Sequence, residues 1–77
     1  MRTPAKPLGL RIKALREARG WTQADLAAQC PLSTVYVQKV ELGERVPTIP
    51  TLTRIARALG ASVVLDLRPH RRTRRRR

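Results

Sequence analysis

The side chains of this 77-residue chain that could carry out covalent or metal chemistry are few and scattered. There is one cysteine, Cys30, and one histidine, His70, which lies inside a run of arginines. Ser33 and Ser62 belong to no nucleophile motif. A single thiol excludes an intrachain disulfide and a multi-thiolate metal site, and it favours a reducing compartment. We therefore expect no enzyme activity, no metal, no cofactor and a cytoplasmic location, with Cys30 acting as a small buried apolar residue.

Basic side chains supply the other available chemistry, which is the binding of anions. Seventeen Lys and Arg against five Asp and Glu give a formal charge of +12, and residues 68–77 hold seven arginines and no acid. A folded monomer tolerates such an excess poorly unless a polyanion or an acidic partner neutralises it. Because guanidinium groups bind phosphate bidentately, nucleic acid is the first candidate, with contacts expected from the tail arginines Arg71, Arg72, Arg74 and Arg75. An inert tail is the alternative.

The N-terminal residues and the overall hydropathy indicate no membrane role. No segment approaches the ~20 apolar residues that span a bilayer, and no apolar stretch of signal-peptide length follows the first residues. Residues 1–7 contain Pro4 and Pro7, which remove backbone donors, so we expect an irregular arm there. The chain is therefore expected to stay in the compartment where it is made.

A first helix is predicted from residue 8, because Leu8, Ile12 and Leu15 recur at helical spacing, and it should end at Gly20. The second begins at Thr22, which forms a capping-box pair with Asp25. It should run to residue 29 or 30, where a proline prevents its continuation. Trp21 precedes this cap and can pack onto Leu26 as a hydrophobic staple, which makes core packing its expected role.

Two more helices and a strand follow. Ser33 is expected to cap a third helix over residues 34–42, and Thr48 opens a fourth that ends at Gly60. Over residues 61–67 the period changes to two, which predicts a β-strand. A lone strand needs a partner, and the strand of a second copy would give a homodimer. The dimerisation residues would be Val63, Leu65 and Leu67, and residues 68–77 should be a disordered tail.

Two short capped helices joined by residues 30–32 are what a helix-turn-helix requires. From about Leu8 to Gly60 the sequence resembles the Cro and phage-repressor type, the xenobiotic-response-element family. The resemblance rests on residues 15–27 (LREARGWTQADLA), residues 40–47 (VELGERVP) and residues 52–60. It implies a mainly α, lambda-repressor-like four-helix domain, with the short C-terminal strand added. It also implies a homodimeric transcriptional regulator that binds a palindromic operator in double-stranded DNA.

The resemblance also implies roles for individual residues. The third helix would enter the major groove and contact bases through Thr34, Val35, Gln38 and Lys39. Phosphate contacts would come from Gln23, Ser33, Tyr36, Arg45, Arg11 and Lys13. Arg16 and Glu41 would form a buried ion pair between the first and third helices. The alternatives are an ordinary solvated face for the third helix and an exposed ion pair of little energetic value.

This sequence departs from the family pattern at two positions. Pro31 stands where a small turn residue such as glycine is common, and Val35 is apolar where a polar base-reading residue is frequent. Base readout at Val35 should therefore be weak.

The predicted C-terminal strand is compatible with more than one class of regulator. A Cro-type domain followed at once by such a strand resembles HipB-like antitoxins, which repress their own operon and hold a toxin kinase. A stand-alone phage-type or host regulator fits the same pattern. A protein-interaction module with an acidic partner and a basic nucleoid-associated protein are alternatives from other classes.

Overall fold

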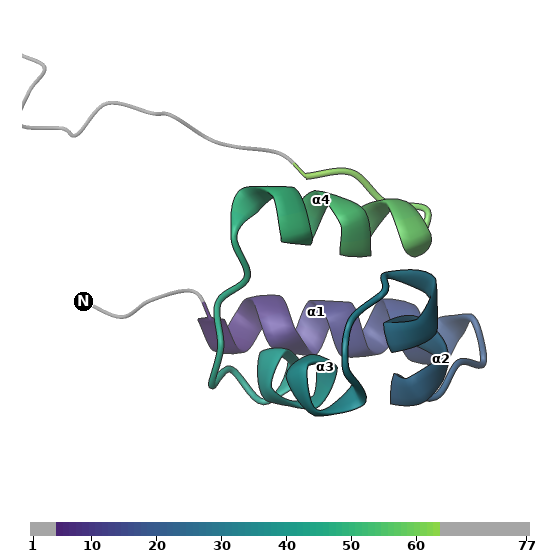
Figure 1. Ribbon diagram of the computed structural model, residues 1–77, viewed down its shortest axis with the longest axis horizontal. Coiled ribbons are helices and arrows are strands. Elements are labelled where there is room, and N and C mark those ends of the chain that lie inside the picture. The colour runs from purple at the N-terminus through teal and green to yellow at the C-terminus, as the bar shows by residue number, and fades with distance from the viewer. Residues whose placement is uncertain (1–4, 64–77) are drawn as a thin grey trace, which may run out of the picture.

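The fold consists of four α-helices, described over residues 5–63 of a computed structural model (Figure 1). They are α1 (Ala5–Ala18), α2 (Gln23–Gln29), α3 (Thr34–Glu41) and α4 (Ile49–Ala58). Helix α3 packs against both α1 and α2, and α2 also contacts α4. The predicted mainly α, four-helix architecture is confirmed. Within this part of the chain no helix has the length and apolar character needed to cross a membrane.

Helix α1 begins earlier than the sequence pattern predicts. Residues 5–7, which we expected to be part of an irregular arm, form its first turn. Pro7 is compatible with this position because the first amides of a helix have no intrahelical carbonyl partner, so a missing N–H costs nothing there. The proline therefore does not mark the boundary of the helix.

The start signals of α2 and α3 act as predicted. The Thr22 hydroxyl accepts a hydrogen bond from the backbone N–H of Asp25 at 3.0 Å, and the Asp25 carboxylate accepts one from the Thr22 N–H at 2.8 Å. The Ser33 hydroxyl accepts from the backbone N–H of Tyr36 at 3.0 Å. Each bond satisfies an amide that the helix itself leaves unpaired, so both helices have a defined first residue.

All four helices end with the same hydrogen-bond pattern, but one of them differs in the type of residue that follows its cap. In each, a backbone N–H just beyond the helix donates to the carbonyl oxygen five residues earlier, as from Leu32 to Ala27 at 2.9 Å and from Glu44 to Lys39 at 2.9 Å. The residue immediately before this donor has a positive φ. Three helices place a glycine there, with φ of 74°, 80° and 70°, but α2 places Pro31 at 28°. The exception lies in the turn between α2 and α3.

The core is small and aliphatic. Its fully buried side chains are Leu26, Cys30, Val37, Val40 and Ile55, and Trp21 packs against this cluster while remaining partly exposed. Burial raises the pKa of the Cys30 thiol, with the charge of Arg54 opposing the shift, which fits the predicted apolar role. Because α2, α3 and α4 all contribute, the core fixes these helices relative to one another.

The predicted C-terminal strand lies mostly beyond the described residues. Residues 61–63 have no regular secondary structure, and residues 5–63 contain no strand. Leu65, Leu67 and the tail arginines Arg71, Arg72, Arg74 and Arg75 fall outside the described part of the chain.

Candidate nucleic-acid interface

Helix α3 presents one face to solvent and one to the core. Thr34, Val35, Gln38 and Lys39 are all exposed, Val35 to 58%, whereas Val37, Val40 and Glu41 are buried. This division follows from the helical repeat of 3.6 residues, which brings positions three and four apart onto one side. The four residues predicted to contact bases therefore share the exposed face, and they can reach a ligand without rearrangement of the core.

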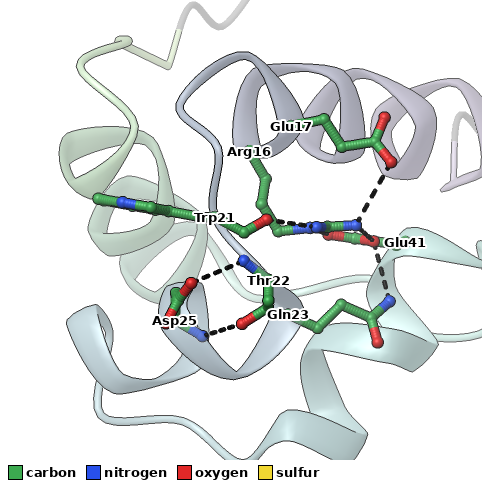
Figure 2. A network of polar contacts seen from close by, with 7 residues as sticks. All are labelled: Arg16, Glu17, Trp21, Thr22, Gln23, Asp25 and Glu41. Atoms are coloured by element: carbon green, nitrogen blue, oxygen red, sulfur yellow. Dashed lines mark hydrogen bonds and ion pairs between the residues drawn. The ribbon is translucent and has the colours of Figure 1, made fainter.

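A buried ion pair fixes α3 to α1. The Arg16 Nε donates to Glu41 Oε2 at 2.6 Å and an Arg16 Nη donates to Glu41 Oε1 at 3.0 Å (Figure 2). The two side chains are only 9% and 3% exposed, so the exposed-pair alternative is wrong. The bond to Glu41 raises the pKa of Arg16 despite the opposing effect of burial. A bidentate pair of this kind restricts rotation of α3 as well as its distance from α1.

Arg16 also reaches the connection between α1 and α2. Its other Nη donates to the backbone carbonyl of Trp21 at 2.7 Å (Figure 2). Trp21 in turn lies beneath Arg19, whose guanidinium carbon is 4.8 Å from the ring centroid. One buried arginine thus ties α1 to α3 and to Trp21 in the connection between α1 and α2.

Gln23, the first residue of α2, joins the same network. Its Nε2 donates to Glu41 Oε1 at 3.0 Å, so α1, α2 and α3 meet at one carboxylate (Figure 2). The family resemblance predicts a phosphate contact for Gln23 and does not indicate this bond. An amide nitrogen carries two hydrogens, and Glu41 is its acceptor among the described residues. The second hydrogen is available to a phosphate oxygen, in an orientation that Glu41 restrains.

The remaining predicted phosphate contacts near α3 lie at its two ends. The Ser33 oxygen accepts a bond from Tyr36, which leaves its hydroxyl hydrogen as a donor. Arg45 follows α3, and its guanidinium carbon lies 5.9 Å from the centroid of the half-buried Tyr36 ring. The structure therefore brings Tyr36 and Arg45 together beside α3.

Arg11 and Lys13, the two predicted phosphate contacts on α1, lie on different sides of that helix. Gly9 marks the side that touches α3. At ~100° of rotation about the helix axis per residue, Lys13 lies roughly 40° from Gly9, whereas Arg11 lies roughly 200° from it. Arg11 in fact lines a groove between α1 and α4. The structure therefore places Lys13, which is exposed, on the α3 side of α1 and does not bring Arg11 to α3.

Gly9 is a packing position that the sequence analysis did not identify. A Cβ added there would lie 2.5 Å from the carbonyl oxygen of Glu41 and closer still to that of Val40. Only glycine allows α1 to approach the last turn of α3 this closely. Its signal in the sequence is a lone glycine inside a helical pattern, which often marks a close contact.

Comparisons with known proteins agree on one family. Residues 7–70 match the family described as helix-turn-helix domain. The chain is 39% identical over 59 residues to the uncharacterised HTH-type transcriptional regulator y4dJ of Sinorhizobium fredii, covering 77% of each chain. It is also 41% identical over 56 residues to the immunity repressor protein of Bacillus phage phi105, covering 73% of this chain and 39% of the repressor.

Solved structures show the same arrangement of helices. The clp gene regulator ClgR of C. glutamicum superposes with a TM-score of 0.77 at 29% identity, over 80% of each chain. The restriction-modification controller protein C.AhdI of Aeromonas hydrophila gives 0.69 at 34% identity, over 71% of this chain and 83% of that one. Other relatives are larger: this chain spans about one fifth of three mycobacterial HTH-type regulators that are 42% identical over 52 residues.

Proposed function

The chain belongs to the helix-turn-helix domain family, and from this premise we propose that it is a sequence-specific, DNA-binding transcriptional repressor. The observation that carries the proposal is the division of α3: its exposed face carries the polar Thr34 and Gln38 and the basic Lys39 beside apolar Val35, whereas its other face is buried through Val37, Val40 and Glu41. Repression is supported by the likeness to a phage immunity repressor. The described residues contain no cluster suited to a metal ion.

In this proposal the exposed side chains of α3 read the major groove. Lys39 can donate to guanine O6 and N7, Gln38 can pair bidentately with adenine, and Thr34 or Val35 can contact a thymine methyl group. Gln23, Ser33 and Arg45 would hold the flanking phosphates, with Lys13 in support. The network of Arg16, Glu41 and Gln23 would set the angle at which α3 enters the groove, because it joins three helices at one point.

A gel-shift experiment tests this proposal. The full chain is titrated into its own promoter DNA with a large excess of random duplex as competitor, and specific retention is expected. Retention that the competitor abolishes would instead favour the nucleoid-associated alternative. If neither DNA is retained, a protein-interaction module becomes the better interpretation.

One lysine variant and one arginine variant make the test residue-specific. Lys39→Ala should weaken binding by ~1–3 kcal/mol and relax discrimination at one base pair, as expected for a base contact. Arg57→Ala is the matched control, because it removes one positive charge from the exposed surface of α4. A uniform loss over all DNA sequences for Lys39→Ala would make this residue a phosphate contact.

We further propose a homodimer in which residues 61–67 of two copies pair as strands. Two α3 helices would then reach half-sites ~34–36 Å apart on one face of a palindromic operator. Sedimentation of the full chain should give twice the mass of the monomer. The antitoxin interpretation depends on element order alone; the identity of the neighbouring gene tests it.

The tail is proposed to add affinity without sequence preference. If about half of the seven arginines in residues 68–77 contact phosphates, they steepen the salt dependence of binding, since each neutralised phosphate releases counterions. Ending the chain after Leu67 should flatten this dependence and leave the preferred operator unchanged. An unchanged slope would remove the tail from the interface.

A further inference from the structure

An apolar groove of about 480 Å³ lies between α1 and α4. The partly buried leucines Leu8 and Leu15 of α1 and Leu52 of α4 line it, and Arg11 is the one charged lining residue among residues 5–63. None of the predicted DNA contacts of α2 or α3 takes part in it. Leucine side chains left facing an open groove lose the stabilisation that full burial provides, so the groove has a physical reason to be covered.

The chain itself forms part of the wall of this groove after α4. After Gly60 the backbone turns back beside α4 (Figure 1), and residues 61–63 line the groove together with α1 and α4. Val63, the last residue that the structure describes, is partly buried there. The residues that follow are Val64, Leu65, Asp66 and Leu67, three of them apolar. The segment that follows the last described lining residue of the groove is therefore mainly apolar.

We propose that the groove is the docking site of residues 64–67 of the same chain, with Leu65 and Leu67 filling it. In an extended backbone, side chains alternate between two sides, so Leu65 and Leu67 share the side of Val63. Val64 and the charged Asp66 then point away from the groove. The period of two that first indicated a strand is thereby explained by one apolar side that meets the domain.

The tether favours this occupant over others. Four extended residues span roughly 13 Å. Because the segment is already joined to Val63, its docking costs less translational and rotational entropy than the binding of a second copy. Among the described lining residues only Arg11 and Ser62 have polar side chains, so a small polar ligand would find few groups there to orient it. The docked segment keeps its backbone edge, which remains available for the strand pairing proposed above.

The direct test is a methyl NMR experiment on the full chain. A sample mixed from isotope-labelled and unlabelled protein separates contacts within one molecule from contacts between two. Intramolecular nuclear Overhauser effects are expected from the Leu65 and Leu67 methyl groups to those of Leu8 and Leu52. Effects seen only between labelled and unlabelled molecules would assign the groove to a second copy and overturn the proposal, as would the absence of any such effect.

Paired variants test the alternation. Changing Leu65→Asn together with Leu67→Asn should lower the thermal midpoint by roughly 5–10 °C, because the groove loses both apolar side chains. Val64→Asn, the matched control on the opposite side, should shift it by less than about 2 °C. An equal loss in both variants contradicts the assigned side. These readouts do not involve DNA, so failure of the proposed repressor function would leave the groove result standing.

Discussion

The two sides of α1 differ in how closely they are packed. On the α3 side, Gly9 brings the two backbones together and the Arg16–Glu41 pair is bidentate and buried. On the α4 side, partly buried leucines line an open groove of about 480 Å³. Stringent geometry is thus concentrated where it fixes the orientation of α3. The domain therefore fixes the orientation of α3 by close packing and a buried ion pair, whereas α1 and α4 are packed less closely.

Removal of one partner of the buried Arg16–Glu41 pair should have the largest effect. Glu41→Ala leaves the Arg16 charge buried without its carboxylate and should cost ~3–5 kcal/mol of unfolding free energy. Urea denaturation followed by circular dichroism measures the loss. Replacing both partners with Arg16→Met and Glu41→Leu should cost far less, because no unpaired charge remains. If the double variant loses as much as the single one, the pair is not what holds α3.

A steric change on the same side should have the next largest effect. Gly9→Ala drives a methyl group into the carbonyl oxygens of Val40 and Glu41, so α1 must move away from α3. We expect a net loss of ~1–3 kcal/mol, even though alanine is the better helix former. Thermal unfolding provides the measurement. Leu10→Ala on the exposed face of α1 is the control, and an unchanged midpoint for Gly9→Ala would show that the close approach is dispensable.

The α2–α3 turn offers a change in the opposite direction. Pro31 has a φ of 28°, far from the value near −65° that its ring prefers, whereas the other three helices have glycine in this place. Pro31→Gly removes the strain and restores an N–H that can bond to the end of α2, but it adds freedom to the unfolded chain. The net expectation is a gain of ~1 kcal/mol. A lower stability would mean that the proline ring is accommodated in this turn.

The smallest expected effect separates two basic residues on α1. Lys13→Ala should weaken binding to all DNA sequences and reduce the salt slope by about 1, as for one lost phosphate contact. Arg11→Ala, on the groove side, should leave both nearly unchanged, although it removes the same charge. Titrations at several salt concentrations distinguish them. Equal slopes for the two variants would show that overall charge, rather than the side of α1, governs affinity.

Much of the fold was predictable because its signals are local. The capping pair of Thr22 and Asp25, the Ser33 cap and the terminating glycines each act within three or four residues, and the structure confirms them. The predicted start of α1 at residue 8 was wrong because a proline is compatible with a first helical turn. The exposed face of α3 also followed from its periodicity. Its contacts with bases and phosphates remain predictions.

What the sequence determined by itself is the identity and order of the helices, since hydrogen bonds between near neighbours decide where a helix begins and ends. The family resemblance already predicted the pair of Arg16 and Glu41, but the tertiary structure alone decided that Gln23 joins it, across 18 residues of chain. It also decided which side of α1 carries Lys13 and which carries Arg11. The physical reason is that these features depend on how whole helices are rotated and packed against one another, which the spacing within one helix does not specify.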